Sequence, residues 1–381
     1  MRLLYVTDAL AIYGGVERVL TQKVNWLAEH GYEVCVLTVN QGREPLSFPL
    51  HSSVQYDDLN ILFYQQYSFV GWNRWLKKHQ LNRLFRHRLS ERIKVFSPDV
   101  IICTSLEYVY SLLLVKGHIP LVLESHSSCL CESFEHDGIC RRLYMRYMKH
   151  FVKQTAMVVA LTDGDAAEWR KYSSHVCVIP NVVSLNPNNV ISDCSAKSAI
   201  FVGRFSGQKD IGSLLRIWSV VHEQYPDWEL HIYGGYGVEK AKRITEINSS
   251  GTNIVVHEPS AEILERYKEN SIFLLTSKYE PFGLVLPEAM SCGLPVVAFD
   301  CPYGPVDIIT DGVDGYLIKD RSVTEYANKV CQLIGNIGQR CQMGKAGVLS
   351  SQKYSPDSIM PRWIDLFMQL SVKYKQNKYD S

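Results

Sequence analysis

Two basic residues, Arg204 and Lys209, lie five positions apart in the segment 203–210, directly after an apolar stretch at 199–202. The stretch is typical of a buried strand, and a helix is expected to begin near Asp210. Converging positive groups that partly exclude water bind a diphosphate well. Because strand ends carry the ligand sites of open α/β sheets, we expect Arg204 and Lys209 to bind a diphosphate. The alternative is two solvated surface charges.

Glu280 and Glu288 follow the apolar stretch 272–276, with Glu280 before a predicted helix and Glu288 inside it. Amide groups at a helix start can bind oxygen anions, and carboxylates can accept hydrogen bonds from sugar hydroxyls. This segment is therefore expected to hold a phosphorylated, polyhydroxylated ligand. The alternatives are an acid placed favourably near a helix start for Glu280 and a solvated helix face for Glu288. The amides expected to point outwards belong to Phe282, Gly283 and Leu284.

Gly14 and Gly15 separate the first predicted strand, 2–7, from the helix that follows it. Glycines at this place let backbone N–H groups approach an anion at the positive end of a helix. The G-x-G-x-x-G pattern of dinucleotide sites is lacking. A tight strand–helix turn is the alternative interpretation.

Residue patterns typical of metal sites are sparse. The eleven cysteines include no C-x-x-C pair, so we expect reduced thiols in a cytoplasmic protein, Cys129 and Cys131 included. The D-x-D pattern, Asp163 and Asp165, lies at an expected helix start, where Asp is a favoured cap. We therefore expect no metal ion and no other cofactor.

Short apolar stretches alternate with helical stretches along the chain. This pattern is typical of parallel strands buried on both faces, and it predicts an α/β protein with two doubly wound, Rossmann-like units. The polar stretch 181–197, which carries Pro187, predicts the linker. It separates a first domain, 1–184, from a second, 185–355, and a helix at about 356–376 completes the first domain. Ligands are expected in a cleft between the carboxyl ends of the two sets of strands. The expected strands are 2–7, 33–39, 99–104, 120–125, 157–161 and 176–180, then 199–202, 229–233, 253–257, 272–276 and 295–299.

The composition is that of a soluble globular chain, because 46% of the 381 residues are apolar and 21% are charged. Lys and Arg number 40 against 39 Asp and Glu, so the net charge of +1 provides no basic field for nucleic acid. No apolar run is long enough to cross a bilayer, and the mean hydropathy is −0.08. The N-terminus is interpreted as a buried strand and not as a signal peptide.

One long segment, residues 279–317, reads YEPFGLVLPEAMSCGLPVVAFDCPYGPVDIITDGVDGYL. It resembles the signature of the retaining family-four glycosyltransferases, whose GT-B fold has two Rossmann-like domains facing across a cleft. GGVER at 14–18, IPN at 179–181 and GRFSGQKD at 203–210 match the same family in the same order. The resemblance extends over about residues 1–370, and it implies a transferase that uses a nucleotide-sugar donor.

The resemblance implies a role for each residue of the donor site. Arg204 and Lys209 would bind the donor diphosphate, and Glu288 would hold the ribose hydroxyls. Glu280, with the amides named above, would contact the transferred sugar and the departing phosphate. The segment 234–237 departs from the family's glycine–proline turn, which leaves its nucleotide contact open.

In the first domain, the resemblance implies that Gly15, in the turn that begins with Gly14, closes over the diphosphate. His126, at the end of the stretch 120–125, matches a family histidine near the sugar. A hydrogen-bonded histidine at a strand end is the alternative.

The implied reaction moves a hexose or N-acetylhexosamine from a nucleoside diphosphate to a hydroxyl, with retention of the anomeric configuration. Stabilising the departing diphosphate is the largest task, so Arg204 and Lys209 are expected to be catalytic, together with Glu280 and His126. A covalent double displacement with Glu280 as nucleophile is the alternative. Residues 300–305 resemble those of relatives that use UDP-sugars. A sugar-nucleotide epimerase or hydrolase on the same fold and a silent sugar-binding scaffold stay open.

Two segments are strongly basic. Residues 72–94 carry eight Lys and Arg against one Glu, 8 − 1 = +7, and residues 141–153 carry five Lys and Arg and no acid. Both are expected to be amphipathic helices on an anionic membrane at the inner face of the plasma membrane, which fits a polyprenyl-linked saccharide acceptor. The alternative is an ordinary solvated helix face packed on the core. The apolar residues that could contact lipid in the first segment are Trp72, Trp75, Leu76, Leu84 and Phe85.

Overall fold

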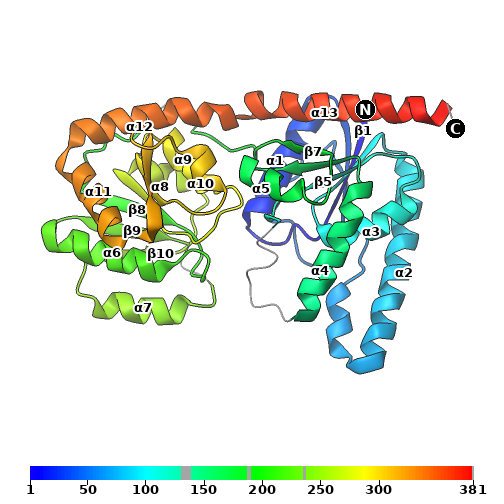
Figure 1. Ribbon diagram of the computed structural model, residues 1–381, viewed down its shortest axis with the longest axis horizontal. Helices are drawn as coiled ribbons and strands as arrows, with labels where there is room; N and C mark the ends of the chain where they lie inside the picture. The colour runs from blue at the N-terminus through cyan, green and yellow to red at the C-terminus, as the bar shows by residue number, and fades with distance from the viewer. Residues whose placement is uncertain (130–138, 187–189, 235–236, 380–381) are drawn as a thin grey trace. The chain divides into compact units, whose positions relative to one another are not determined.

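The apolar stretches of the chain pair into two parallel sheets, one after the other (Figure 1). The contacts divide the chain into unit 1, Met1–Val182 with Ile359–Ser381, and unit 2, Val183–Ser358. Each unit has helices packed on a parallel sheet, so the predicted α/β class is confirmed. The computed structural model describes residues 1–129, 139–186, 190–234 and 237–379.

The division differs slightly from the boundaries expected from the sequence. Unit 1 ends at Val182 instead of residue 184, and the chain returns to it at Ile359 instead of near residue 356. Residues 190–197 belong to the expected linker but pack on unit 2, where the Arg340 guanidinium donates to the Cys194 carbonyl at 2.9 Å. A polar segment that is hydrogen-bonded to the following domain has the same composition as a free linker. Composition alone therefore could not show that residues 190–197 belong to unit 2.

Unit 1 has a seven-stranded sheet in the order β3-β2-β1-β4-β5-β6-β7. Strand β1 pairs with both β2 and β4, so the order reverses there, and ligands of such sheets bind at the carboxyl ends beside this point. The edge strand β3 is not among the expected strands, because its sequence QYDD has no apolar run. The strands are β1 (Arg2–Thr7), β2 (Glu33–Thr38), β3 (Gln55–Asp58), β4 (Val100–Cys103), β5 (Leu121–Glu124), β6 (Met157–Ala160) and β7 (Val176–Val178).

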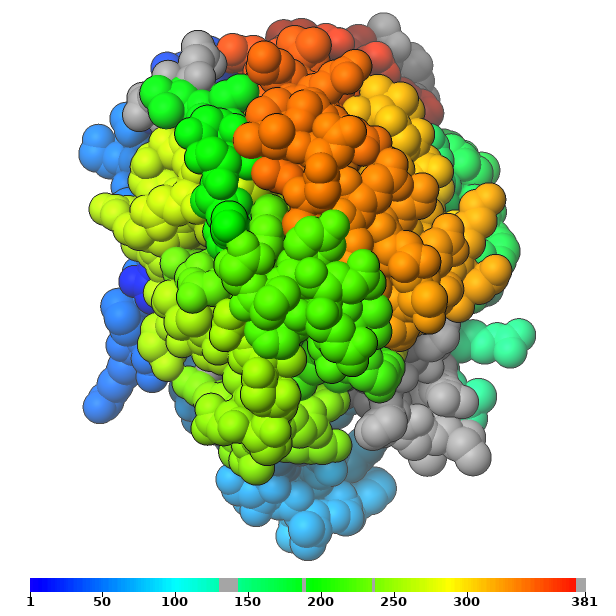
Figure 2. Space-filling model, turned by 90° about the vertical axis from the view of Figure 1, so that its left-hand side faces the viewer, coloured from blue at the N-terminus to red at the C-terminus, as the bar shows by residue number. Residues whose placement is uncertain are grey.

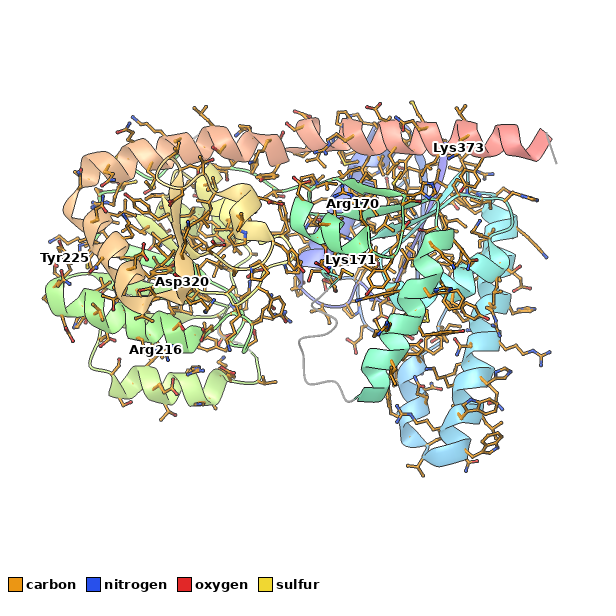
Figure 3. The ribbon with its side chains drawn as sticks, in the orientation of Figure 1. Arg170, Lys171, Arg216, Tyr225, Asp320 and Lys373 are labelled. Carbon is orange, nitrogen blue, oxygen red and sulfur yellow. The ribbon has the colours of Figure 1, made fainter. Side chains whose placement is uncertain are left out.

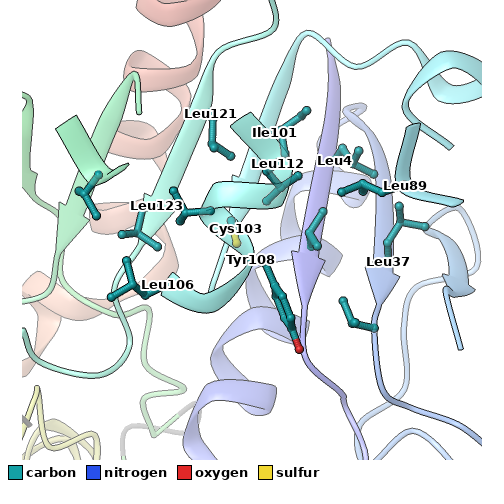
Figure 4. Packing of buried hydrophobic residues seen from close by; sticks show 14 of the residues in the cluster. Leu4, Leu37, Leu89, Ile101, Cys103, Leu106, Tyr108, Leu112, Leu121 and Leu123 are labelled. Atoms are coloured by element: carbon teal, nitrogen blue, oxygen red, sulfur yellow. The ribbon is translucent and has the colours of Figure 1, made fainter. Parts of the chain in front are cut away.

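Helices cover both faces of the unit 1 sheet and bury two apolar clusters. One cluster packs the helices α2 to α5 on the sheet, and Figure 4 shows part of it, with the Tyr108 hydroxyl at the carboxyl end of β1. The other packs α1 and α13, where Trp363 and Phe367 bring the C-terminal helix back to unit 1. The helices are α1 (Gly15–Glu29), η1 (Phe63–Ser68), α2 (Gly71–Phe96), α3 (Leu106–Val115), α4 (Ile139–Phe151), η3 (Val152–Gln154), α5 (Asp163–Trp169) and α13 (Pro356–Tyr379).

Unit 2 has a six-stranded parallel sheet in the order β10-β9-β8-β11-β12-β13. Strand β13 is not among the expected strands, because its four residues lie in a stretch rich in Gly and Asp. The strands are β8 (Ser198–Val202), β9 (Glu229–Tyr233), β10 (Ile254–His257), β11 (Ile272–Leu275), β12 (Val296–Phe299) and β13 (Gly315–Ile318).

The helices of unit 2 cover both faces of its sheet, and α6, α11 and α12 form much of the surface seen in Figure 2. Trp218 of α6 and Tyr326 of α11 are fully buried in the apolar cluster beneath them. The helices are α6 (Ile211–Gln224), α7 (Lys240–Ser249), α8 (Ile263–Lys268), α9 (Val285–Ser291), α10 (Gly304–Ile308), η4 (Lys319–Arg321), α11 (Val323–Gly335), α12 (Ile337–Ser351) and η5 (Gln352–Tyr354).

Candidate functional site

Lys209 and Glu280, which belong to separate motifs, meet in an ion pair at the carboxyl edge of the unit 2 sheet. The Lys209 Nζ atom lies 2.5 Å from Glu280 Oε1, and the Ser277 hydroxyl donates to the same oxygen at 2.6 Å. Lys209 follows β8 and Glu280 follows β11, and these strands are neighbours. The two side chains are 13% and 5% exposed. A cation and a carboxylate are therefore held against each other with little water around them.

Arg204 lies on the same loop as Lys209 but is exposed. No hydrogen bond or ion pair joins its guanidinium to another described residue. A guanidinium in this state can bind an incoming anion with two parallel hydrogen bonds. The loop after β8 thus presents one exposed cation and one paired cation at the edge where a ligand of this sheet would bind.

Hydrogen bonds between the loops after β8 and β11 hold the ion pair in position. The Gln208 carbonyl accepts from Lys278 N–H at 2.8 Å, and the Gln208 side-chain amide donates to the Tyr279 carbonyl at 3.1 Å. The Thr276 hydroxyl donates to the Lys209 carbonyl at 3.0 Å. Gln208, to which the sequence assigned no role, therefore joins the two loops.

Arg321 supports the same two loops and is a residue that sequence reasoning missed. Its guanidinium donates to the Ser277 carbonyl and to Asp210 Oδ2, each at 2.7 Å. Asp210 also caps α6 by accepting from the Ser213 amide at 3.3 Å. Burial opposes ionisation of Asp210, but the hydrogen bonds from Ser213 and Arg321 lower its pKa. Asp320 (Figure 3) and Arg321 have φ of 52° and 50°, a left-handed turn that no glycine signals in the sequence.

The segment between Glu280 and α9 is tightly packed. The Glu280 carbonyl accepts from Gly304 N–H at 2.9 Å, and a β-carbon added to Gly304 would lie 1.8 Å from the Phe282 carbonyl oxygen. The φ of +88° at Gly283 favours glycine. Helix α9 begins after these residues, so the amides expected at its first turn precede it. Within the described chain, no hydrogen-bond acceptor was found for the backbone N–H groups of Phe282, Gly283 and Leu284.

Glu288 lies inside α9 and is only 2% exposed, so the interpretation of a solvated helix face is wrong. The Tyr267 hydroxyl lies 3.5 Å from Glu288 Oε2, at the long end of the hydrogen-bond range. The two carboxylates therefore have different surroundings: Glu280 is paired with a lysine, and Glu288 is buried beside a phenol. A buried carboxylate retains the capacity to accept hydrogen bonds from ligand hydroxyls.

In unit 1, Gly14 and Gly15 form the turn from β1 into α1. The Gly14 N–H donates to the Ile12 carbonyl at 2.8 Å, so this amide is used within the turn and does not point at an anion as expected. The Glu17 carboxylate lies over the turn, where a β-carbon on Gly14 would be 2.3 Å from Glu17 Oε2. The strand–helix turn is thus the better interpretation of Gly14. Gly15 is the first residue of α1, at the helix start where the sequence placed it.

His126 follows β5 beside a buried ion pair. The Lys23 Nζ atom lies 2.5 Å from the Glu124 carboxylate and 3.6 Å from the centre of the Trp363 ring. The His126 Nε2 atom lies 3.3 Å from Glu124 Oε1 but outside hydrogen-bond geometry. Burial alone would raise the pKa of Glu124, but Lys23 and His126 lower it to about 2. His126 therefore keeps a ring nitrogen without a hydrogen bond to the described residues.

The D-x-D pattern at the start of α5 serves the fold of unit 1. The Asp165 carboxylate accepts from Cys129 N–H at 2.6 Å and from Trp169 Nε1–H at 3.1 Å. Thr162, and not an Asp, caps the helix. Burial raises the pKa of Asp165 to about 6. In the described ranges, no group of three or more His, Cys, Asp or Glu side chains could hold a metal ion. Predictions that lie outside those ranges concern Cys131, Pro187 and the turn at 235–236.

The two basic segments are only partly surface helices. Phe85 is buried and does not belong to an exposed apolar face, whereas Trp72 is 68% and Trp75 is 53% exposed. Lys149 is buried and donates to the Cys129 carbonyl at 2.5 Å, so it is not a surface cation. No helix in the part of the chain that the structure describes is long and apolar enough to span a membrane. The core face of α2 consists of Leu81, Phe85, Leu89, Ile93 and Phe96.

Two family models match the chain, one in each unit. The model described as Glycosyltransferase Family 4 matches residues 13–186, and the model described as Glycosyl transferases group 1 matches residues 190–348. The second match includes the ion pair and both glutamates, and the first includes His126.

Known proteins are similar over almost the whole chain. An uncharacterized glycosyltransferase of Haemophilus influenzae is 27% identical and covers 92% of this chain and 95% of its own. The amylovoran biosynthesis glycosyltransferase AmsD of Erwinia amylovora is 27% identical and covers 96% of this chain and 99% of its own. Among solved structures, S. aureus TarM in complex with fondaparinux, alpha-GlcNAc-glycerol and UDP superposes with a TM-score of 0.77 at 16% identity, covering 96% and 99% of the two chains. Sucrose-phosphate synthase of Thermosynechococcus elongatus superposes with a TM-score of 0.80 at 18% identity, covering 98% and 100%.

Proposed function

We propose, on the premise that the chain belongs to the family-four glycosyltransferases and has the GT-B fold, that it is a retaining hexosyltransferase. It moves a hexose or N-acetylhexosamine from a UDP-sugar to a hydroxyl of a saccharide or a polyprenyl-linked saccharide. The observation that carries the proposal is the Lys209–Glu280 ion pair, with Arg204 on the same loop. This arrangement provides cations for a diphosphate beside a carboxylate for a sugar.

The names of similar proteins support the donor and the pathway. TarM was solved with UDP, and a relative from Salmonella typhimurium is named lipopolysaccharide 1,6-galactosyltransferase, at 24% identity over 88% of this chain. AmsD is named for the synthesis of amylovoran. We therefore place the reaction in surface polysaccharide synthesis, with a UDP-sugar as donor and with no metal ion required.

In the proposed reaction the bond between the anomeric carbon and the diphosphate breaks, and a bond to the acceptor oxygen forms on the same face of the sugar. Arg204 and Lys209 stabilise the charge that develops on the departing diphosphate, which is the term that contributes most to such reactions. Glu280 positions the transferred sugar and keeps Lys209 in place. The proton of the acceptor hydroxyl passes to an oxygen of the departing phosphate. The acceptor oxygen itself attacks the anomeric carbon, and Glu280 forms no bond to the sugar.

Thermal stability in the presence of UDP, GDP or ADP tests the donor site. A ligand at one hundred times its dissociation constant adds about 2.7 kcal/mol to the free energy of unfolding, which a melting curve resolves. We expect a shift with UDP that persists in EDTA. A shift only with GDP would move the donor to GDP-sugars, a shift that requires Mg²⁺ would contradict metal independence, and no shift with any nucleotide would contradict the proposed function.

Substitution of each glutamate by glutamine should separate their roles. Glu288→Gln is expected to weaken UDP binding about tenfold, because a hydrogen bond to a charged group contributes about 1.5 kcal/mol or more. Glu280→Gln is expected to slow transfer about tenfold with little effect on UDP binding. Glu325→Gln, an exposed glutamate of α11, is the matched control. Identical effects of the two substitutions on binding and rate would contradict the separate roles.

The N-terminal part of α2 is proposed to bind an anionic membrane surface. Tyr67, Trp72 and Trp75 are each more than half exposed, and the rings of the two tryptophans stack with centres 4.6 Å apart. No Asp or Glu lies between Asp58 and Glu91. Arg74 lies between the two tryptophans, and Lys77 and Lys78 follow them. Exposed aromatic rings next to cations match the interface of an anionic bilayer.

Sedimentation with vesicles tests the membrane proposal. The protein is expected to sediment with vesicles that contain anionic lipid at low salt, and less with purely zwitterionic vesicles, because each cation near the surface contributes about 1 kcal/mol. The double substitution Trp72→Ser and Trp75→Ser should reduce binding, whereas Leu349→Ser, at an apolar residue of α12 that is 77% exposed, should not. Failure to sediment with anionic vesicles would show that this surface is an ordinary solvated face.

A further inference from the structure

The guanidinium group of Arg321 joins the ends of two neighbouring strands of the unit 2 sheet. Its acceptors after β11 are the Ser277 carbonyl at 2.7 Å and the Thr276 carbonyl at 2.9 Å. Its acceptor after β8 is the Asp210 carboxylate, 2.7 Å away. Its Cζ atom also lies 4.3 Å from the centre of the Phe299 ring, where β12 ends. The guanidinium is therefore held on several sides at the carboxyl edge of the sheet.

The two carbonyl acceptors belong to residues that hold the ion pair of the proposed donor site. The Ser277 hydroxyl donates to Glu280 Oε1 at 2.6 Å, and the Thr276 hydroxyl donates to the Lys209 carbonyl at 3.0 Å. The carbonyl of each residue therefore accepts from Arg321, while its side chain binds a member of the pair. Among the described residues, no ion pair joins Arg321 to Glu280 itself. Arg321 thus acts on the pair through these neighbours.

The carboxylate acceptor fixes the backbone next to the cation of the pair. Asp210 directly follows Lys209, and its φ of 48° lies in the left-handed region. Its carboxylate accepts from Arg321 and from the Ser213 hydroxyl, each at 2.7 Å. Non-glycine residues keep such a conformation only where surrounding contacts determine it. The hydrogen bond from Arg321 is one of these contacts, so it helps to orient the backbone that carries Lys209.

Arg321 itself lies in a turn of the same unusual kind. Asp320 and Arg321 have consecutive positive φ values, 52° and 50°. Strained backbone of this kind clusters at functional sites. Asp320 (Figure 3) is exposed, and its side chain makes no hydrogen bond to another described residue. The side-chain contacts that determine this turn therefore come from Arg321.

We infer that Arg321 is a positioning residue for sugar transfer, which sets the geometry of the Lys209–Glu280 pair through the two loops. A misplacement of about 1 Å can lower a rate about 10²-fold even when the substituted residue lies away from the reacting atoms. The effect of Arg321 should therefore appear in the rate of the chemical step and not in the affinity for UDP. This inference rests on the proposed function and adds a residue that no motif of the chain identifies.

The variants Arg321→Gly and Asp320→Gly test this inference as a matched pair. Glycine readily adopts positive φ, so neither substitution opposes the turn, and only the first removes the guanidinium. Release of UDP from UDP-glucose, UDP-galactose and UDP-N-acetylglucosamine is measured as kcat and KM on the full chain. We expect kcat to fall at least about tenfold in Arg321→Gly, with KM and the thermal shift caused by UDP unchanged. In Asp320→Gly all three quantities should stay unchanged.

A second substitution separates positioning from a general loss of folded protein. In a chain that already carries Lys209→Ala, Arg321→Gly should lower kcat less than about threefold, because the cation that Arg321 positions is gone and the two effects do not add. Arg321→Lys should regain part of the rate in the otherwise unsubstituted chain, since an ammonium group can still bind one of the acceptors.

Four results would each overturn the role of Arg321. They are an unchanged kcat in Arg321→Gly, a loss of UDP affinity as large as the loss of rate, an equal loss of rate in Asp320→Gly, and a full additional loss in the Lys209→Ala chain. Failure of the unsubstituted protein to release UDP from any of the three sugars would instead contradict the proposed function, and the inference with it. Normal release by the unsubstituted protein together with one of the four results would contradict the role of Arg321 alone.

Discussion

Replacement of Lys209 by alanine is expected to lower the rate of sugar transfer roughly 10²–10³-fold, as the loss of a group that stabilises transition-state charge does in other enzymes. Two effects act in the same direction. The departing diphosphate loses a cation, and the Glu280 carboxylate, which is 5% exposed, loses the partner 2.5 Å away. The unpaired carboxylate then opposes the negative charge that develops during departure. The rate is measured as transfer to a saccharide acceptor, and UDP binding is measured in parallel.

The matched control for this prediction is Lys345→Ala, which removes an exposed lysine of α12 in the same unit. It should change neither the rate nor UDP binding. The double variant Lys209→Ala and Glu280→Gln should regain part of the lost stability but not the rate, because it removes the unpaired buried charge without restoring the cation. A loss of rate smaller than tenfold in folded Lys209→Ala would show that the ion pair serves the fold and not the reaction.

The positions of most elements could be predicted from local patterns. Buried parallel strands are short apolar runs, so β1, β8 and β11 were expected within about one residue of their observed bounds. Strands β3 and β13 were not expected, because β3 is polar at a sheet edge and β13 lies in a stretch rich in Gly and Asp. The loops that carry the candidate ligand-binding residues could also be predicted, because parallel strands bring their carboxyl ends to one edge of the sheet.

The contacts that organise the proposed donor site could not be predicted from the sequence. Lys209 and Glu280 are distant in the chain and each has a separate local explanation, so their pairing depends on the order of strands in the sheet. Arg321 carries no motif, and its hydrogen bonds to Ser277 and Asp210 follow from a left-handed turn that usually needs glycine or asparagine. Long-range side-chain contacts of this kind leave no periodicity to detect.

In the two basic segments, 72–94 and 141–153, the pattern of charged and apolar residues did not show which side chains are exposed. Phe85 and Trp75 both looked like members of one apolar face, yet Phe85 is buried and Trp75 is 53% exposed, because the helix turns one face to the core along only part of its length. Lys149 counted as a surface cation but is buried and bonded to a carbonyl. Net charge over a window therefore does not show which charges reach the solvent.

Replacement of Lys23 by methionine is expected to destabilise unit 1 by about 3–5 kcal/mol, because the buried Glu124 carboxylate loses the ammonium group that neutralises it. Lys23 and Glu124 are each 1% exposed, and the ammonium group also lies over the Trp363 ring. The double variant Lys23→Met and Glu124→Gln removes both charges and should regain most of the loss. Because the chain has two units, the free energy is measured by hydrogen exchange of amides in β1 and β5 and not by a single melting transition.

The pH dependence of the same amides provides a second test of the Lys23–Glu124 pair. The pKa of Glu124 is about 2 in the folded chain against an ordinary value of 4.5. A carboxylate with a lowered pKa stabilises the fold at pH values above its ordinary pKa, and this contribution is lost as the pH falls towards 2. The unsubstituted protein should therefore lose stability between about pH 5 and pH 2, and the double variant should lose less. The exposed Arg2–Glu33 pair, with Nε and Oε2 3.2 Å apart, is the matched control for Lys23→Met. Glu33→Gln should lower the free energy of unfolding by about 1 kcal/mol or less. If Lys23→Met costs no more than Glu33→Gln, then the buried pair contributes no more to the stability of unit 1 than a surface pair does.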